Sequence, residues 1–153
     1  MIGLLLVMTM ERTLIIIKPD GMRQNLAGEI ISRYEKAGLK VIAKKTMSAD
    51  RALLQQHYSA HVEKPFYPGL EKFMMETPLM VFILEGENAI AKAREVTGAT
   101  DPCKAAKGTI RGDLSDDSQE KADKEKRAIR NLVHASGNQQ EAAIEIKLWF
   151  PEL

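Results

Sequence analysis

One histidine, His134, stands where a side chain could attack a phosphoryl group and carry it. It ends a short apolar run just before a predicted helix, and Glu145 lies in the second turn of that helix. A carboxylate there can hold the imidazole in one tautomer and stabilise the cation that forms. Ser136 could hydrogen-bond this carboxylate or stiffen the turn. With neutral imidazole as nucleophile, phosphoryl transfer becomes two in-line displacements through a phosphohistidine.

Three cations could serve such chemistry. Lys18, Arg94 and Arg111 each lie near the end of a predicted element, beside small or polar residues. Gly108 and Gly112 flank Arg111, and we expect them to let a ligand approach the backbone. Each cation alone is a weak signal because surface Lys and Arg are common. Converging on one site, they would neutralise a polyphosphate and its transition-state charge.

Other motifs narrow the class of site. The chain has no G-x-x-x-x-G-K-[ST] run and no G-x-G-x-x-G after a strand, which excludes a P-loop, a Rossmann site and a protein-kinase lobe. His57 and His61 have helical spacing, but no HExxH motif or third ligand accompanies them, so we interpret them as packing or surface residues. Phe66 could stack on a base or pack in the core, and the residues leave both alternatives open.

The elements that must position these residues follow from periodicity and turn signals. Strands are predicted at residues 13–17, 39–47, 79–84 and 132–134, and the continuous apolar run at 79–84 indicates a central strand covered on both faces. Helices are predicted to begin at the caps Asn25, Ser48 and Asn138, the last with Glu141 in a capping-box pattern. Further helices are expected over 66–75 and 87–96, and a loop over 101–114. This order favours an α+β fold of the split βαβ type, a four-stranded, mostly antiparallel sheet with helices packed on one face.

The length, net charge and cysteine content of the chain limit its domain count, its compartment and its partners. The chain has 153 residues, a net charge of +1 and one cysteine, Cys103. We expect a single domain over 1–153 in a reducing, cytoplasmic compartment, with no nucleic-acid or membrane partner. The apolar start at 2–8 is too short to span a bilayer and lacks a signal peptide's features. Residues 1–10 are interpreted as a frayed or over-annotated N-terminus; the alternatives are a targeting role, an extra strand or an oligomer contact.

The segment at 115–127 is a charged insertion whose composition differs from that of the rest of the chain. It has almost no apolar residues, and its charges are spaced for i,i+4 pairs such as Asp123 with Arg127. The pattern predicts a solvated helical arm or mobile loop, which could be shortened with modest loss of activity. A role over the active site is the alternative.

Several separated motifs resemble nucleoside diphosphate kinases, in the same order: KPDG at 18–21, QHY at 56–58, PF at 65–66, GTIRGD at 108–113 and NLVHAS at 131–136. The resemblance covers residues 11–150 and implies a ferredoxin-like fold. It also implies ping-pong transfer of a γ-phosphoryl group from a nucleoside triphosphate, usually ATP, to a nucleoside diphosphate. Mg²⁺ would arrive on the nucleotide's phosphates with few protein ligands, and the enzyme would be a homo-oligomer, a hexamer or tetramer.

The resemblance also implies a role for each matching residue. His134 would be phosphorylated and oriented by Glu145, with Tyr58 supporting that end of the site. The remaining residues would bind the nucleotide. Lys18 and Asn131 would bind the ribose, and Lys18 would also reach the transferred phosphate. The phosphates would be bound by Arg94, Thr100 and Arg111, and the base would lie against Phe66 and Leu70. Stacking without base-edge hydrogen bonds explains why the family accepts many bases.

Two departures from the family pattern concern details around the site. The family usually has a Gly-Ser-Asp run after the histidine, whereas this chain has Ala135, Ser136 and Gly137. The segment between Asp113 and Asn131 is longer than is typical, and Ala128 is the nearest match to the residue that covers the base's second face. The alternative function is a non-catalytic nucleotide-binding module of the same fold. RNA binding is disfavoured because the strands lack exposed aromatics.

Overall fold

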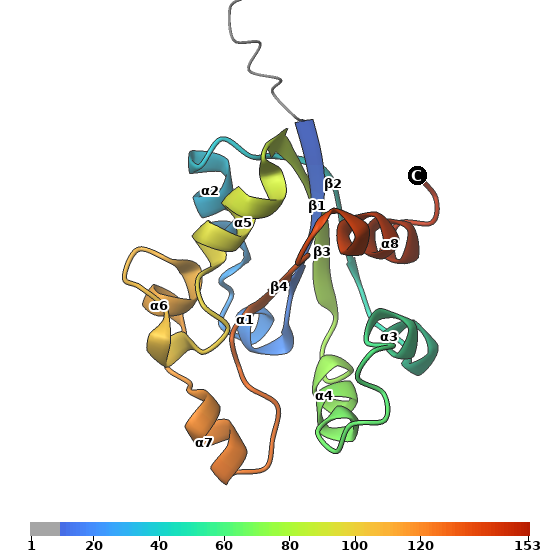
Figure 1. The fold of residues 1–153 in the computed structure, drawn as a ribbon, viewed down its shortest axis with the longest axis vertical. Coiled ribbons are helices and arrows are strands. Elements are labelled where there is room, and N and C mark those ends of the chain that lie inside the picture. The colour runs from blue at the N-terminus through green and yellow to red at the C-terminus, as the bar shows by residue number, and fades with distance from the viewer. Residues whose placement is uncertain (1–9) are drawn as a thin grey trace, which may run out of the picture.

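Four strands form one antiparallel sheet in the order β2-β3-β1-β4 (Figure 1). The computed structural model describes residues 10–153, so the expectation for residues 1–9 lies outside the described residues. The strands are β1 (Met10–Ile17), β2 (Lys40–Met47), β3 (Leu79–Glu87) and β4 (Val133–Ala135). The predicted α+β fold with an antiparallel four-stranded sheet is confirmed.

The two central strands are buried on both faces. Residues 14–17 of β1 and 81–84 of β3 have no exposed surface. Because successive side chains of a strand point to opposite faces, Ile15 and Ile17 enter one hydrophobic core while Leu14 and Ile16 enter another. The continuous apolar run at 79–84 was therefore a correct signal for a central strand covered on both sides.

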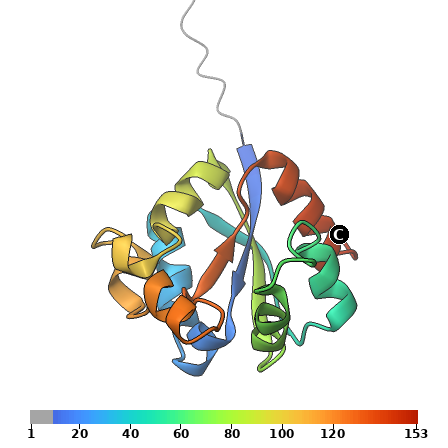
Figure 2. The same ribbon diagram turned by 60° about the horizontal axis from the view of Figure 1, so that its bottom comes forward.

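Helices cover both faces of the sheet, so the prediction of helices on one face is wrong. On one side lie α2 (Ala27–Lys36), α5 (Ala89–Thr97) and α6 (Ile110–Leu114), whose apolar residues join the core with Ile15. On the other side lie α3 (Arg51–His57), α4 (Tyr67–Met74) and α8 (Gln139–Trp149), which pack with Leu14 (Figures 1 and 2). Alternating apolar side chains on both faces of β1 require this arrangement. Among residues 10–153, no helix combines the length and apolar character needed to cross a membrane.

One of the three predicted helix caps is confirmed. The Asn138 side chain accepts the Glu141 N–H at 2.8 Å and begins α8. The cap of α3 is Asp50, which accepts the Leu53 N–H at 2.8 Å, and not Ser48. Asn25 adopts a left-handed φ of 55° and turns the chain out of the short helix α1 (Pro19–Arg23), so it makes no side-chain cap for α2.

The segment predicted as a loop at 101–114 contains the 3₁₀ turn η1 (Pro102–Lys104) and α6. The insertion that follows holds a short helix, α7 (Gln119–Lys124). The predicted helical arm is therefore present and most of its residues are exposed, but it is not solvated all round, because Ala122 is fully buried. Arg127 pairs with Asp117 through two hydrogen bonds of 2.8 Å, and the predicted pairing with Asp123 is absent among the described residues.

Candidate active site

A cavity of about 480 Å³ brings the predicted site residues together. Its wall draws on segments that are far apart in the sequence: the end of β1, the α3–α4 region, α5 and the loop after it, α6, the arm around α7, and β4. The predicted residues that line it are Lys18, Tyr58, Phe66, Leu70, Arg94, Thr100, Arg111, Asn131 and His134. Glu145 lies behind His134 and reaches the cavity only through that side chain.

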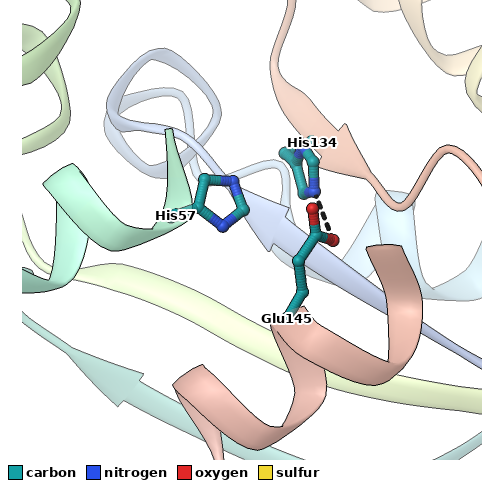
Figure 3. A group of neighbouring side chains, drawn as sticks. All are labelled: His57, His134 and Glu145. Carbon is teal, nitrogen blue, oxygen red and sulfur yellow. Dashed lines mark hydrogen bonds and ion pairs between the residues drawn. The ribbon is translucent and has the colours of Figure 1, made fainter. Parts of the chain in front are cut away.

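The His134 ring is held from behind by a hydrogen-bonded carboxylate (Figure 3). His134 Nε2 lies 2.8 Å from Glu145 Oε1, and the Ser136 hydroxyl donates to the same oxygen at 2.7 Å. Burial by itself raises the pKa of Glu145, but the hydrogen bonds from His134 and Ser136 outweigh it and leave that pKa below its ordinary value. An ionised carboxylate only accepts, so the Nε2 proton donates to it and the lone pair of a neutral ring lies on Nδ1.

The backbone before His134 is bent into a sparsely populated conformation. Leu132 has a φ of 72°, which costs a non-glycine residue free energy. Both of its backbone polar groups are bonded: its N–H donates to the Asp20 carboxylate at 3.0 Å, and its carbonyl accepts the Lys18 N–H at 2.8 Å. These bonds hold the bend that lets the Asn131 and His134 side chains line the same cavity.

Lys18 is a nearly buried ammonium at the end of β1. Its side chain donates to Asn131 Oδ1 at 2.8 Å, and the Asn131 amide donates to the Thr100 carbonyl at 3.0 Å. Burial and the nearby Arg111 guanidinium lower the pKa of Lys18 to about 8, although Asp20 opposes them. An anionic ligand would relieve the repulsion between the two cations, so the site favours polyphosphate.

Arg111 is also buried, and the backbone fixes its guanidinium. It donates to the carbonyls of Asn131 at 3.0 Å, Val133 at 2.6 Å and Gly98 at 3.2 Å. Desolvation lowers the pKa of Arg111 to about 10, so the group keeps its charge at neutral pH. Arg94 is exposed on α5 and lines the same cavity, so the three predicted cations do converge.

The glycines beside Arg111 serve a different purpose from the one predicted. A Cβ on Gly112 would overlap the Ala106 carbonyl, so this glycine allows close packing of α6 on the preceding loop. Gly108 adopts a φ of 93°, which supplies the turn before α6. Neither glycine lines the cavity, so the predicted approach of a ligand to this backbone is not supported.

His57 is the site residue that the sequence analysis missed. Its ring lies edge to face against His134, with centroids 4.6 Å apart (Figure 3). Its Nδ1 accepts the Trp149 indole N–H at 3.0 Å. Burial and the neighbouring His134 lower the pKa of His57 to about 3, so this ring is neutral. The only sequence feature that could have indicated a role for His57 is the QHY motif at 56–58. Its contact partners, His134 and Trp149, come from distant segments.

Potential ligand atoms of His57, His134 and Glu145 lie within 4.8 Å of one another. A metal ion there would have to displace the proton that His134 shares with Glu145. The hydrogen bonds already present favour a metal-free role for these three side chains.

Apolar and aromatic groups also line the cavity. Phe66 precedes α4, lines the cavity and remains 53% exposed, so its ring face is available to a planar partner. Leu70 lines the cavity beside it. Tyr58 also lines the cavity and packs edge to face on His57, with centroids 4.5 Å apart. Ala128 lines the cavity as well, which agrees with its suggested position over a bound base.

Replacing Glu145 by glutamine should slow phosphoryl transfer by roughly 10- to 100-fold, the range typical when a group that orients a metal-bound histidine is lost. Glutamine fills the same space but cannot stabilise a positive imidazole by its charge. Single-turnover labelling of His134 measures the effect. Glu35→Gln is the matched control, since Glu35 is an exposed carboxylate on the opposite side of the sheet. Equal rates in both variants would show that the Glu145 charge is not needed.

A ferredoxin-like α+β fold with a carboxylate-held histidine and three cations around one cavity defines a phosphotransferase. The family model for nucleoside diphosphate kinase matches residues 11–153. The chain therefore belongs to the nucleoside diphosphate kinase family.

Individual relatives agree with this assignment. A nucleoside diphosphate kinase of Thermobifida fusca is 46% identical over 144 residues, which cover 94% of this chain and 99% of the relative. The enzyme of Delftia acidovorans is 47% identical over 144 residues, 94% and 95% of the two chains. A Borrelia burgdorferi structure, a transition-state mimic with vanadate and ADP, is similar with a TM-score of 0.88 at 38% identity, covering 92% of this chain and 87% of that one. An NDP kinase structure from Pyrobaculum aerophilum has a TM-score of 0.85 at 34% identity, covering 93% and 96%.

Proposed function

We propose that the chain moves the γ-phosphoryl group of a nucleoside triphosphate to a nucleoside diphosphate in two displacements at His134 Nδ1. In the first, the Nδ1 lone pair forms a bond to the γ-phosphorus while the bond to the β,γ-bridging oxygen breaks. The departing diphosphate keeps that oxygen and its electron pair. In the second, a terminal oxygen of the acceptor attacks the phosphorus, and the N–P electron pair returns to Nδ1. The carrying observation is the 2.8 Å contact that commits Nε2 to Glu145 and leaves Nδ1 free to react.

Charge compensation comes from the buried cations. Arg111 and Lys18 are fixed by hydrogen bonds before any ligand arrives, so they need little reorganisation to stabilise charge on the transferred group. Arg94 and Thr100 complete the phosphate contacts, and Lys18 with Asn131 binds the ribose hydroxyls. Tyr58, packed edge to face on His57, supports the His134 end of the cavity.

The base stacks on Phe66 with Leu70 beside it. Phe66→Ala should weaken the apparent affinity for every diphosphate by roughly tenfold, since stacking on one aromatic ring stabilises a base by about 1–3 kcal/mol. The rate of labelling at saturating ATP should change little because the phosphate contacts remain. Met75→Ala removes another exposed apolar side chain at the end of the same helix and is the control. Unchanged affinity in the Phe66 variant would place the base elsewhere.

Mg²⁺ accompanies the nucleotide and neutralises charge on its phosphates. The chemistry of the donors fits this route, because the phosphate end of the cavity is lined by cations. Two carboxylates line the cavity: Glu141 accepts the Gly137 N–H at 2.9 Å, and Asp123 accepts from Gln119 at 2.8 Å. Gly137, where the family usually has an acidic residue, removes one oxygen ligand from this region.

Further properties follow from family membership. The chain is proposed to form a single domain over 1–153 and a homo-oligomer, hexamer or tetramer, which light scattering distinguishes. It is proposed to act in the cytoplasm on ATP and other nucleoside di- and triphosphates, without nucleic-acid or membrane partners.

Incubation with γ-labelled ATP tests the central proposal. The label should appear on the protein, resist base, be lost in acid and leave when a diphosphate is added. These are the properties of a phosphohistidine. A non-catalytic nucleotide-binding module would bind the nucleotide without becoming labelled.

A further inference from the structure

The insertion at 115–127 contributes side chains to the wall of the cavity. Its helix α7 and the helix α4, which follows Phe66, lie at the same end of the molecule (Figure 1). Gln119, Asp123 and Arg127 of the insertion line the same cavity as Phe66 and Leu70. The insertion therefore supplies polar groups to the part of the site where we place the base.

Hydrogen bonds hold the insertion in place. Its two ends are tied together where Arg127 and the Arg130 N–H both donate to the nearly buried Asp117, in each case at 2.8 Å. The hydrogen bonds from Arg127 hold the pKa of Asp117 well below its usual range, so the pair stays ionised. The Gln119 N–H donates to Asp101 at 3.2 Å and fastens α7 to the loop after α5. With Ala122 buried, α7 has a fixed position before a ligand binds.

Asp123 is oriented by a neighbour on its own helix. The Gln119 amide donates to Asp123 Oδ1 at 2.8 Å, whereas Oδ2 has no hydrogen-bond partner among residues 10–153. The cavity thus carries a charged acceptor at its base end, held by a helix whose position is fixed. Such a group binds N–H donors and repels carbonyl or ring-nitrogen acceptors.

We propose that Asp123 reads the edge of the base and makes this enzyme favour guanine nucleotides. The inference rests on the proposed position of the base at Phe66. Guanine alone among the common bases presents two adjacent donors, N1–H and the 2-amino group, which match the two oxygens of a carboxylate. Adenine and cytosine place an acceptor beside their amino group, and uracil flanks its one N–H with two carbonyls. Stacking on Phe66 allows every base to bind, while Asp123 of the insertion makes guanine the preferred base.

Single-turnover transfer from the labelled enzyme to separate diphosphates tests the proposal. The wild type should transfer to GDP with a larger kcat/KM than to ADP, CDP or UDP, and also than to inosine diphosphate, which lacks the 2-amino group. Asp123→Ala should reduce the GDP/ADP and GDP/IDP ratios by about tenfold, the lower end of the range for a hydrogen bond to a charged group. Asp123→Asn should do the same, since an amide presents one donor and one acceptor.

Glu120→Gln is the matched control, because it removes one negative charge from α7 at a residue that does not line the cavity. Its base ratios should equal those of the wild type. Ratios that stay unchanged in both Asp123 variants, or that fall equally in the Glu120 variant, would overturn the proposal. A failure of the proposed function is a separate result: the wild type would then take no label from ATP, or would pass it to no diphosphate.

Discussion

His134→Ala should abolish phosphoryl transfer between nucleotides while the protein remains folded. Among residues 10–153, only His134 lines the cavity with an imidazole whose second nitrogen is bonded to a carboxylate, so without it no covalent intermediate can form. Folding should be little affected, because the side chain is partly exposed and the backbone of β4 keeps its pairing with β1. Glu145 would lose one partner but keep the hydrogen bond from Ser136.

Two measurements separate chemistry from folding in this variant. Labelling with γ-labelled ATP should fall to background, and thermal unfolding should stay cooperative, with a loss of stability of about 1 kcal/mol. His61→Ala is the control, since His61 is another partly buried histidine that does not line the cavity. If His134→Ala still accepted label at the native rate, another residue would be the nucleophile.

The sequence predicted the residues of the site better than their physical roles. His134 and Glu145 were recoverable because their spacing along one strand–helix unit fixes their relation locally. The convergence of Lys18 and Arg111 depends on the sheet order, which sets the ends of β1 and β4 side by side, and motif resemblance supplied what spacing could not. The roles of Gly108 and Gly112 were misassigned because a glycine required by packing has the same sequence as one beside a ligand.

Contacts between distant segments account for the remaining errors. His57 had no local feature that marked it, since its partners His134 and Trp149 come from β4 and α8. The prediction of helices on one face conflicted with the apolar run at 79–84, which already indicated a strand covered on both faces. In the insertion, Asp117 is ten residues from Arg127, outside the helical spacing on which the predicted charge pairs depended.

Lys18→Met should lower the rate of phosphoryl transfer by roughly 100-fold, because removing one preorganised charged donor costs about that much. Methionine keeps the apolar stem and fills the space. In the wild type, transfer should weaken as the pH rises through about 8, where the Lys18 ammonium loses its proton. The variant should lack this inflection. Measuring kcat/KM between pH 6.5 and 9.5 in both proteins checks the assignment, and the same inflection in the variant would move it to another group.

The same substitution should stabilise the protein at neutral pH while it reduces activity. Burial lowers the pKa of Lys18 from 10.5 to about 8, so between these values the unfolded chain binds a proton that the folded chain does not. The free energy of unfolding of the wild type therefore increases as the pH rises from about 8 to 10.5. Below pH 8 the folded protein holds a buried charge that destabilises it, and methionine removes that charge. The loss of the hydrogen bond to Asn131 offsets part of this gain. Urea unfolding at pH 7 and pH 10 should show the variant's advantage narrowing at the higher pH, because all other titrating groups are shared. An advantage that widened instead would mean that the folded protein holds the Lys18 proton more tightly than the unfolded chain does.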